Sequence, residues 1–243
     1  MIGPEFIDNR NGNTLAAALA AILSGTGSNG GLQESAPPGR LDIASAFFSP
    51  AGFSEIVDHL NGVEKIRLML GAEPPLDSQP PRRRLDETQA QFERRLIREG
   101  IAHLEAGLRE ERDRLPFLRS SRAALRRLID TLASGRMETR RYERAVLHAK
   151  AYIFAPADRS NYGGAGVIAG SSNLTRAGIT RNLELNLGRY DDPVVAQAQA
   201  WFDELWEEAV PFDLTELLGQ VFAEWTPFEI FLRVLFQLYG GEI

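Results

Sequence analysis

The chain contains no cysteine among its 243 residues. Disulfide bonds and cysteine-based metal sites are therefore excluded. A chain without disulfides is typical of an intracellular protein, so we expect a cytoplasmic location. Near the candidate site described below, no His, Asp and Glu residues cluster at metal-ligand spacing. We therefore expect neither a metal ion nor any other cofactor.

A long hydrophobic run is also missing. The most apolar segment, residues 15–23, covers nine residues and follows a polar stretch rather than a basic one. A helix that crosses a bilayer needs about 20 such residues, and a signal peptide needs a basic start. We therefore expect no membrane anchor and no signal peptide.

The chain has no surplus of positive charge. Its net charge is −6, which excludes a generally basic nucleic-acid binder and means that such binding needs a local positive patch. Lysine is scarce as well, since only Lys65 and Lys150 occur beside 25 arginines. Lys150 stands out because it lies two residues after one of only three histidines.

The hydrophobic pattern predicts an α/β fold. Residues 41–48 and 64–71 have the composition of buried strands, with a helix expected over 50–61 between them. This spacing is typical of a βαβ unit, in which the two strands are parallel. Further strands are expected over 136–143, 147–154, 166–170 and 182–188, and further helices over 14–24 and 194–209. The prediction is a mixed sheet with helices on both faces.

Two segments extend this pattern. Residues 86–112 and 119–134 are Arg- and Glu-rich and helical in character, so 86–134 is expected to be a helical insertion with a solvated outer face. We assign residues 1–212 to one domain. Residues 213–243 are expected to form a C-terminal helical segment with a turn at Trp225, Thr226 and Pro227.

A histidine and a lysine alternate in the strand expected over 147–154. Residues i and i+2 of a strand point to the same side, so His148 and Lys150 stand side by side with Cα atoms about 7 Å apart. Apolar residues at the intervening positions should hold this strand in a core. The pair alone is weak evidence for a site, because a chance pairing on an exposed strand is the simpler alternative.

A polar turn follows the next expected strand. Gly170 permits close backbone approach, and Ser171, Ser172 and Asn173 have the composition of a helix N-cap that leaves main-chain N–H groups free. Such a turn can bind phosphate, although an ordinary helix cap is the alternative. Farther along, Glu184 is either solvent-facing on an edge strand or a carboxylate that orients a histidine.

Taken together, these residue types suit phosphodiester chemistry. One imidazole can attack phosphorus and another can protonate the leaving oxygen. Lysine, amide and hydroxyl donors can stabilise the negative charge that develops on the phosphate oxygens. His148, Lys150, Ser171, Asn173 and Glu184 are therefore the candidate catalytic residues, with Gly170 and Ser172 as candidate substrate-binding residues.

At these residues the sequence resembles the phospholipase D superfamily, whose signature is HxKxxxxD followed by GSxN. His148, Lys150, Ser171 and Asn173 match this signature, and Glu184 falls where nucleases of the family place a supporting carboxylate. The resemblance implies a metal-independent phosphodiesterase with a phosphohistidine intermediate. Because the family reaction uses two HxK strands and this chain has one, it also implies a homodimer with a shared site.

The sequence departs from the signature at one position. The signature aspartate would fall at position 155, where the chain has Ala155, and Asp158 lies three residues later in an expected loop. The stretch from Lys150 to Gly170 is longer than usual and is expected to contain a lengthened hairpin loop. This departure favours a catalytically weak module, whereas the intact residues favour an enzyme.

The wider pattern looks most like phospholipase-D-like domains fused to the N-terminus of bacterial helicases. This resemblance implies nucleic acid, and DNA in particular, as the partner, with residues 213–243 as a connector to a motor domain. Arg136, Arg140 and Arg141 are candidate phosphate contacts because their strand leads into the HxK strand. We therefore predict a nuclease, with a catalytically weak DNA-binding and dimerisation module or a lipid phosphodiesterase as alternatives.

Overall fold

The computed structural model describes residues 3–25, 37–71, 81–114, 119–156, 165–190, 192–219 and 227–239. The helices are α1 (Leu15–Leu23), α2 (Pro50–Ser54), the 3₁₀ helix η1 (Val57–Gly62), α3 (Gln89–Arg114), α4 (Arg119–Ala133), α5 (Arg176–Thr180), α6 (Asp192–Glu208), α7 (Leu214–Gly219) and α8 (Pro227–Tyr239). The strands are β1 (Phe6–Ile7), β2 (Arg40–Ser45), β3 (Lys65–Leu70), β4 (Met137–Arg141), β5 (Lys150–Ala155), β6 (Gly166–Gly170), β7 (Asn186–Arg189) and β8 (Val210–Pro211).

The described strands form one mixed sheet in the order β1-β7-β6-β5-β2-β3-β4-β8. β2, β3 and β4 are parallel to one another, and the other neighbours pair antiparallel. The predicted βαβ unit is confirmed by β2 and β3, although α2 ends at Ser54 and η1 continues the connection. The predicted α/β class is therefore confirmed.

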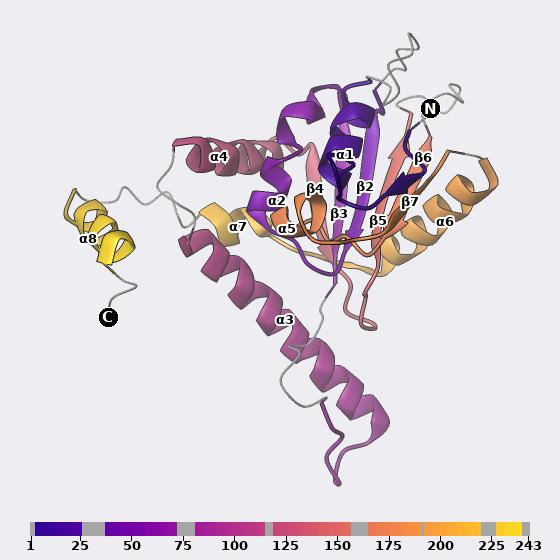
Figure 1. Cartoon of the computed structure of the whole chain (residues 1–243). Helices are drawn as coiled ribbons and strands as arrows, with labels where there is room; N and C mark the ends of the chain where they lie inside the picture. The colour runs from indigo at the N-terminus through magenta and orange to yellow at the C-terminus, as the bar shows by residue number, and fades with distance from the viewer. Residues whose placement is uncertain are drawn as a thin grey trace.

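Helices cover both faces of the sheet (Figure 1). On one face, Leu19 of α1, Phe53 of α2 and Leu128 of α4 pack in a large cluster with the sheet residues Ile43 and Phe154. On the other face, α6 packs over the sheet through a second cluster, whose members include Val195, Phe202, Trp206, Ile153 and Met69. Burial of apolar surface on both faces is the main stabilising contribution to this arrangement.

A buried ion pair holds α6 against its face. Arg67 on β3 binds Asp42 on β2 through two hydrogen bonds of 2.7 and 2.6 Å, and it also reaches Asp203 on α6 at 2.6 Å. The Asp42 side chain is fully buried, so its charge needs these partners. The guanidinium lies 4.9 Å from the ring centroid of Phe202, which adds a cation–π contact.

The helical insertion has two different halves. α4 packs on the body through Leu125, Leu128 and Leu132, while Arg127 and Asp130 on its outer face are exposed, as the predicted solvated face requires. α3 projects away from the sheet (Figure 1). The break between the two helices lies outside the described residues.

Several expected strands differ from the structure. β5 begins at Lys150 and β7 begins at Asn186, both later than predicted, while β1 and β8 were not predicted. β1 pairs with β7, so β7 is not an edge strand. Two-residue strands are too short to show a period, which is why their composition does not reveal them.

Candidate active site

Lys150 is the first residue of β5. It lies at the edge of the sheet that is formed by the C-terminal ends of β2 and β3. It pairs with Ser45 across β2 and β5, and only 6% of its surface is exposed. Its ammonium group lies 2.8 Å from Nε2 and 2.9 Å from Nδ1 of His148, and 3.0 Å from the His148 carbonyl oxygen. His148 precedes the strand and is exposed. The structure therefore presents an accessible imidazole against a buried cation.

The strand that carries Lys150 is held from both sides. Leu147, Ala151 and Ile153 belong to the cluster under α6, as the alternation of the sequence predicts. Tyr152 and Phe154 are also buried, in the opposite cluster, so both faces of β5 are covered. A strand buried on both faces has little freedom to shift its register. This burial fixes Lys150 at the start of the strand.

Asn173 lies at the same edge. Its Oδ1 accepts the backbone N–H of Phe47 at 3.0 Å, in the segment that follows β2. Because a backbone N–H can only donate, the amide oxygen must face Phe47 and the NH₂ group must point elsewhere. Within the described residues that NH₂ group donates to no protein atom. Asn173 therefore has two N–H donors available for a ligand.

Ser45 joins Lys150 to Asn173. The residue is fully buried, and its Oγ donates to the Phe47 carbonyl at 2.6 Å and accepts the Leu174 N–H at 3.0 Å. It also lies 3.4 Å from Asn173 Oδ1. Since the hydroxyl has one proton, the shorter contact with Phe47 takes it. Sequence reasoning missed Ser45, because a serine at the end of an apolar strand carries no distinguishing pattern.

Ser171 and Glu184 form a second polar pair. The Ser171 hydroxyl donates to Glu184 Oε2 and accepts the Leu185 N–H at 3.0 Å. Ser171 is exposed and Glu184 is half-buried. The burial of Tyr152 raises the pKa of its hydroxyl, and the nearby Glu184 carboxylate raises it further, so Tyr152 stays neutral. A role for Glu184 in orienting His148 stays a prediction.

Two predictions about the turn after β6 are wrong. Ser172 is fully buried, with its N–H and hydroxyl bonded to Asn186, so it supports the turn and does not face a substrate. The N-cap of α5 is Thr175, and the N–H groups of Ser171 and Leu174 already have protein acceptors. The turn is therefore not the predicted set of free N–H groups for phosphate.

Gly170 does show the close approach expected of it. A Cβ atom at this position would lie 2.2 Å from the Leu185 carbonyl oxygen and 2.5 Å from Asn186 Oδ1. A Cβ atom does not approach non-bonded atoms this closely, so only glycine fits between β6 and β7 here. Whether Gly170 also contacts a substrate stays a prediction.

The predicted arginine contacts lie farther from the site than expected. β4 is separated from β5 by β2 and β3. Arg136 donates to the carbonyls of Leu60 and Val63, and Arg140 pairs with Glu138 and the Trp206 carbonyl. Arg141 pairs with Glu105 and Glu143. Each therefore has an intramolecular role, and phosphate binding by these side chains stays a prediction.

Some features of the predicted site are outside the described residues. Asp158 and most of the lengthened loop fall within 157–164, which the structure does not describe. Ala155, at the position of the signature aspartate, is the last residue of β5. Among the described residues, no group of three or more His, Cys, Asp or Glu side chains is arranged to hold a metal ion. None of the described helices is long and apolar enough to cross a membrane.

These features agree with the family comparison. The chain belongs to the family described as cardiolipin synthase, PLD-like domain, whose model matches residues 37–206. It is thus a member of the phospholipase-D-like superfamily of phosphodiesterases. The matched region contains both halves of the HxK and GSxN signature. No curated protein matches the sequence.

Solved structures with a similar fold have low sequence identity. Nuc, a phospholipase D family member from Salmonella typhimurium, is 15% identical, with 86% of this chain and 96% of that chain covered and a TM-score of 0.43. NucT from Helicobacter pylori is 12% identical, with coverage of 82% and 91% and a TM-score of 0.41. The phosphatidylserine synthase of Haemophilus influenzae Rd KW20 is 12% identical, with coverage of 98% and 46% and a TM-score of 0.49.

Proposed function

We propose that this protein is a metal-independent nuclease that hydrolyses nucleic-acid phosphodiester bonds through a phosphohistidine at His148. The observation that carries the proposal is the contact between the exposed His148 ring and the buried Lys150 ammonium, 2.8 Å apart. A ring nitrogen is the nucleophile in this chemistry, and an ammonium group beside the ring can hold a phosphate oxygen against it. Asn173 at the same edge supplies further donors.

The proposed reaction has two displacement steps. A ring nitrogen of His148 attacks phosphorus, the bond to the leaving oxygen breaks, and a second imidazole gives that oxygen a proton. Water then attacks the phosphohistidine and gives its proton to the second imidazole. The phosphorus–nitrogen bond breaks and His148 is regenerated. Lys150 and the Asn173 amide stabilise the negative charge on the phosphate oxygens in both steps.

A second copy of the chain would supply the second imidazole. Beside Glu184 lies an apolar strip of side chains that are between 52% and 72% exposed, formed by Phe6, Leu183, Leu185 and Leu187. Exposed apolar patches of this kind are typical of interaction surfaces. A two-fold dimer buries the same patch of both subunits, so the strip supports a homodimer with the shared site nearby.

Nucleic acid is the substrate that the site suits best. His148 and Ser171 are both exposed, so the phosphate of a polymer can reach them. A lipid phosphodiesterase remains the alternative, since the apolar strip could face acyl chains. The other alternative is a DNA-binding module attached to a helicase, with residues 213–243 as its connector. Assays with DNA and with phosphatidylcholine vesicles separate these functions.

The first test is the reaction itself. We expect purified protein to cleave fluorescently labelled single- or double-stranded DNA in the presence of EDTA, because Lys150 and two imidazoles supply the positive charge that a metal would otherwise provide. A heat-denatured sample is the control for background hydrolysis. Activity that EDTA abolishes and a divalent ion restores would contradict the metal-independent mechanism. Binding without cleavage would favour the helicase-associated module.

The shared site predicts a specific result on mixing. Wild-type chains are unfolded and refolded with an equal amount of His148→Ala chains, so random pairing leaves about one quarter wild-type dimers. We expect activity to fall to about a quarter of that of an all-wild-type sample, because mixed dimers have one imidazole. A mixture with His103→Ala chains is the matched control and should keep full activity. Independent sites in each chain would instead leave about half.

A further inference from the structure

The α3 helix is an arm that is attached at the edge of the sheet where the candidate site lies. Before the arm, Gly71 donates its N–H to the Ser45 carbonyl at 3.0 Å. At the base of the arm, Glu105 pairs with Arg141 at 2.9 Å, and Glu111 bonds to Ser49 at the N-cap of α2. From this base α3 extends away from the body (Figure 1). The chain before the arm and the base of the arm are therefore both attached near the site residues.

Charge is unevenly distributed along this arm. Residues 82–98 contain six arginines and three acidic residues, a net charge of +3, whereas the whole chain has −6. Residues 99–114 contain three arginines and five acidic residues, a net charge of −2. The tip of the arm is thus a local positive patch, which an acidic protein needs in order to bind a polyanion.

The tip has a defined structure that presents these charges. Arg95 binds both Glu87 oxygens, at 3.0 and 3.1 Å, and also Glu99 at 3.1 Å and the Arg82 carbonyl at 3.1 Å. Its guanidinium lies 5.3 Å from the Phe92 ring centroid. These contacts hold the turn of residues 82–88 against the start of α3. The Arg95 guanidinium and the Glu87 carboxylate are therefore bound to each other.

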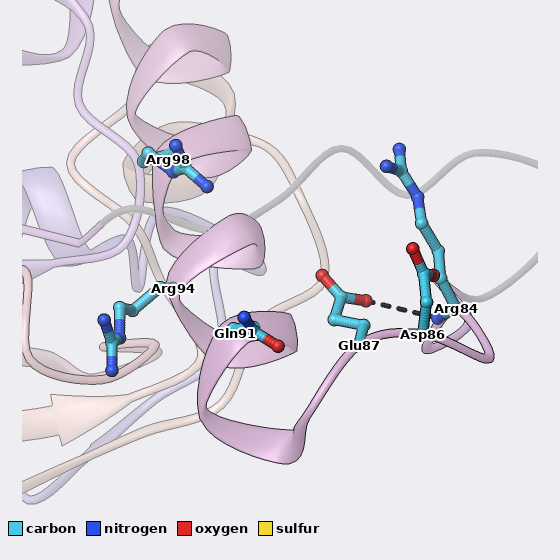
Figure 2. A pocket seen from close by; sticks show the side chains of 6 residues that line it. All are labelled: Arg84, Asp86, Glu87, Gln91, Arg94 and Arg98. Carbon is cyan, nitrogen blue, oxygen red and sulfur yellow. Dashed lines mark hydrogen bonds between the residues drawn. The ribbon is translucent and has the colours of Figure 1, made fainter.

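A hollow at this tip is rich in guanidinium groups (Figure 2). It is lined by Arg84, Asp86, Glu87, Gln91, Arg94 and Arg98. Among the described residues, the side chains of Arg84, Arg94 and Arg98 form no ion pair. The hollow is also lined by two carboxylates. Glu87 is bound by Arg95, which leaves Asp86 as the one carboxylate beside these three guanidinium groups. Such a surface suits phosphate groups.

We propose that Arg84, Arg94 and Arg98 bind the phosphate backbone of the nucleic acid that is cleaved at His148. The inference rests on the proposed nuclease function and deepens it. Arg94 lies 17 residues before Glu111, which is about 26 Å along the helix. At about 3.4 Å per base pair this corresponds to roughly seven or eight base pairs from the base of the arm. The arm therefore contacts only substrates long enough to reach it.

Nucleic acid fits this tip better than a membrane surface does. Leu85 is the one large apolar side chain of the described tip that is classed as exposed, and most of the other exposed residues there are polar or charged. A membrane-binding segment needs a continuous apolar face beside its cations. The three guanidinium groups that line the hollow instead suit the phosphates of a nucleic acid.

The test compares two variants with equal loss of charge. In the arm variant, Arg84, Arg94 and Arg98 are replaced by Gln. In the control variant the same replacement is made at three cations that have acidic partners, Lys65, Arg109 and Arg127. Circular dichroism and melting temperature establish that both variants are folded. Binding of a labelled 30-base-pair duplex is measured by fluorescence anisotropy at several salt concentrations.

We expect the arm variant to bind the duplex at least about tenfold more weakly, with a log–log salt slope smaller by about three, because each lost phosphate contact removes about 0.9. Hydrolysis of a dinucleotide should be unchanged, since it cannot reach the arm. The control variant should bind the duplex as wild type does. Equal weakening of both variants, or no weakening of the arm variant, would overturn the inference.

The outcomes also separate this inference from the proposed function. If wild-type protein binds the duplex through the arm but cleaves neither substrate, the catalytic proposal fails and the arm inference stands. If cleavage occurs and the arm variant matches wild type on both substrates, the arm inference alone fails. Arm-dependent binding to phosphatidylglycerol vesicles without binding to the duplex would identify a membrane surface instead and overturn the inference.

Discussion

Replacing His148 with Ala is expected to lower the rate of phosphodiester hydrolysis at least about a thousandfold, because the phosphohistidine intermediate cannot form without this imidazole. The fold should be unchanged, since His148 is exposed and precedes β5. The rate is measured with labelled DNA, and the melting temperature establishes that the variant is folded. The matched control is His103→Ala, an exposed histidine on α3.

A direct search for the intermediate complements this variant. Wild-type protein quenched in alkali during turnover of a ³²P-labelled substrate should carry an acid-labile label, and the His148→Ala protein should carry none. Phosphohistidine is labile to acid and stable to alkali, which distinguishes it from phosphoserine at Ser171. A His148→Ala protein with full activity would show that the nucleophile is elsewhere.

The Asn173→Asp variant is expected to lose about 100- to 1,000-fold in kcat, comparable with removal of a transition-state donor in other enzymes. The new carboxylate can still accept the Phe47 N–H, which Asn173 Oδ1 accepts at 3.0 Å, so the local structure should persist. The NH₂ donors, however, become an oxygen that repels the phosphate.

The control for this change is Asn61→Asp, which adds the same charge at an exposed position on η1. It should retain wild-type kcat and KM. A wild-type rate for Asn173→Asp would show that the amide does not contact the reacting phosphate. If Asn173→Asp lost activity because a large fall in melting temperature left it unfolded at the assay temperature, Asn173 would act only by holding the segment after β2.

Much of the fold follows from local pattern. The runs that became β2 and β3 are short, apolar and separated by a helical segment, so the parallel pair could be predicted from spacing alone. The HxK pair could be found for the same reason, because its apolar neighbours Ala151 and Ile153 mark a strand. The two-residue strands β1 and β8 could not be predicted, since each forms only by pairing with a strand that is distant in the sequence or set by the fold, β7 and β4 respectively.

The site was predicted less completely than the fold. Ser172 and Asn173 are adjacent in the sequence and equally polar, yet Ser172 is fully buried while Asn173 keeps free donors. The arginines in and just before β4 also have the composition of a phosphate-binding row, but Arg136 and Arg141 are bonded to groups 36 or more residues away in the sequence. Partners at that separation leave no local pattern.

The sequence by itself determined the chemistry available to this protein: one HxK strand, a GSSN turn, no cysteine and two lysines. These depend on residue type and on spacing within single elements, where strand and helix periods are local properties. Only the tertiary structure decided which of these groups meet. Ser45, Lys150 and Asn173 come together because β2 is inserted between β5 and β3. The arginine-rich end of α3 projects because the α3 residues that join the core cluster, Leu104 and Leu108, lie nearer its base. Long-range pairing is set by burial of both faces of the sheet, a property that no single segment carries.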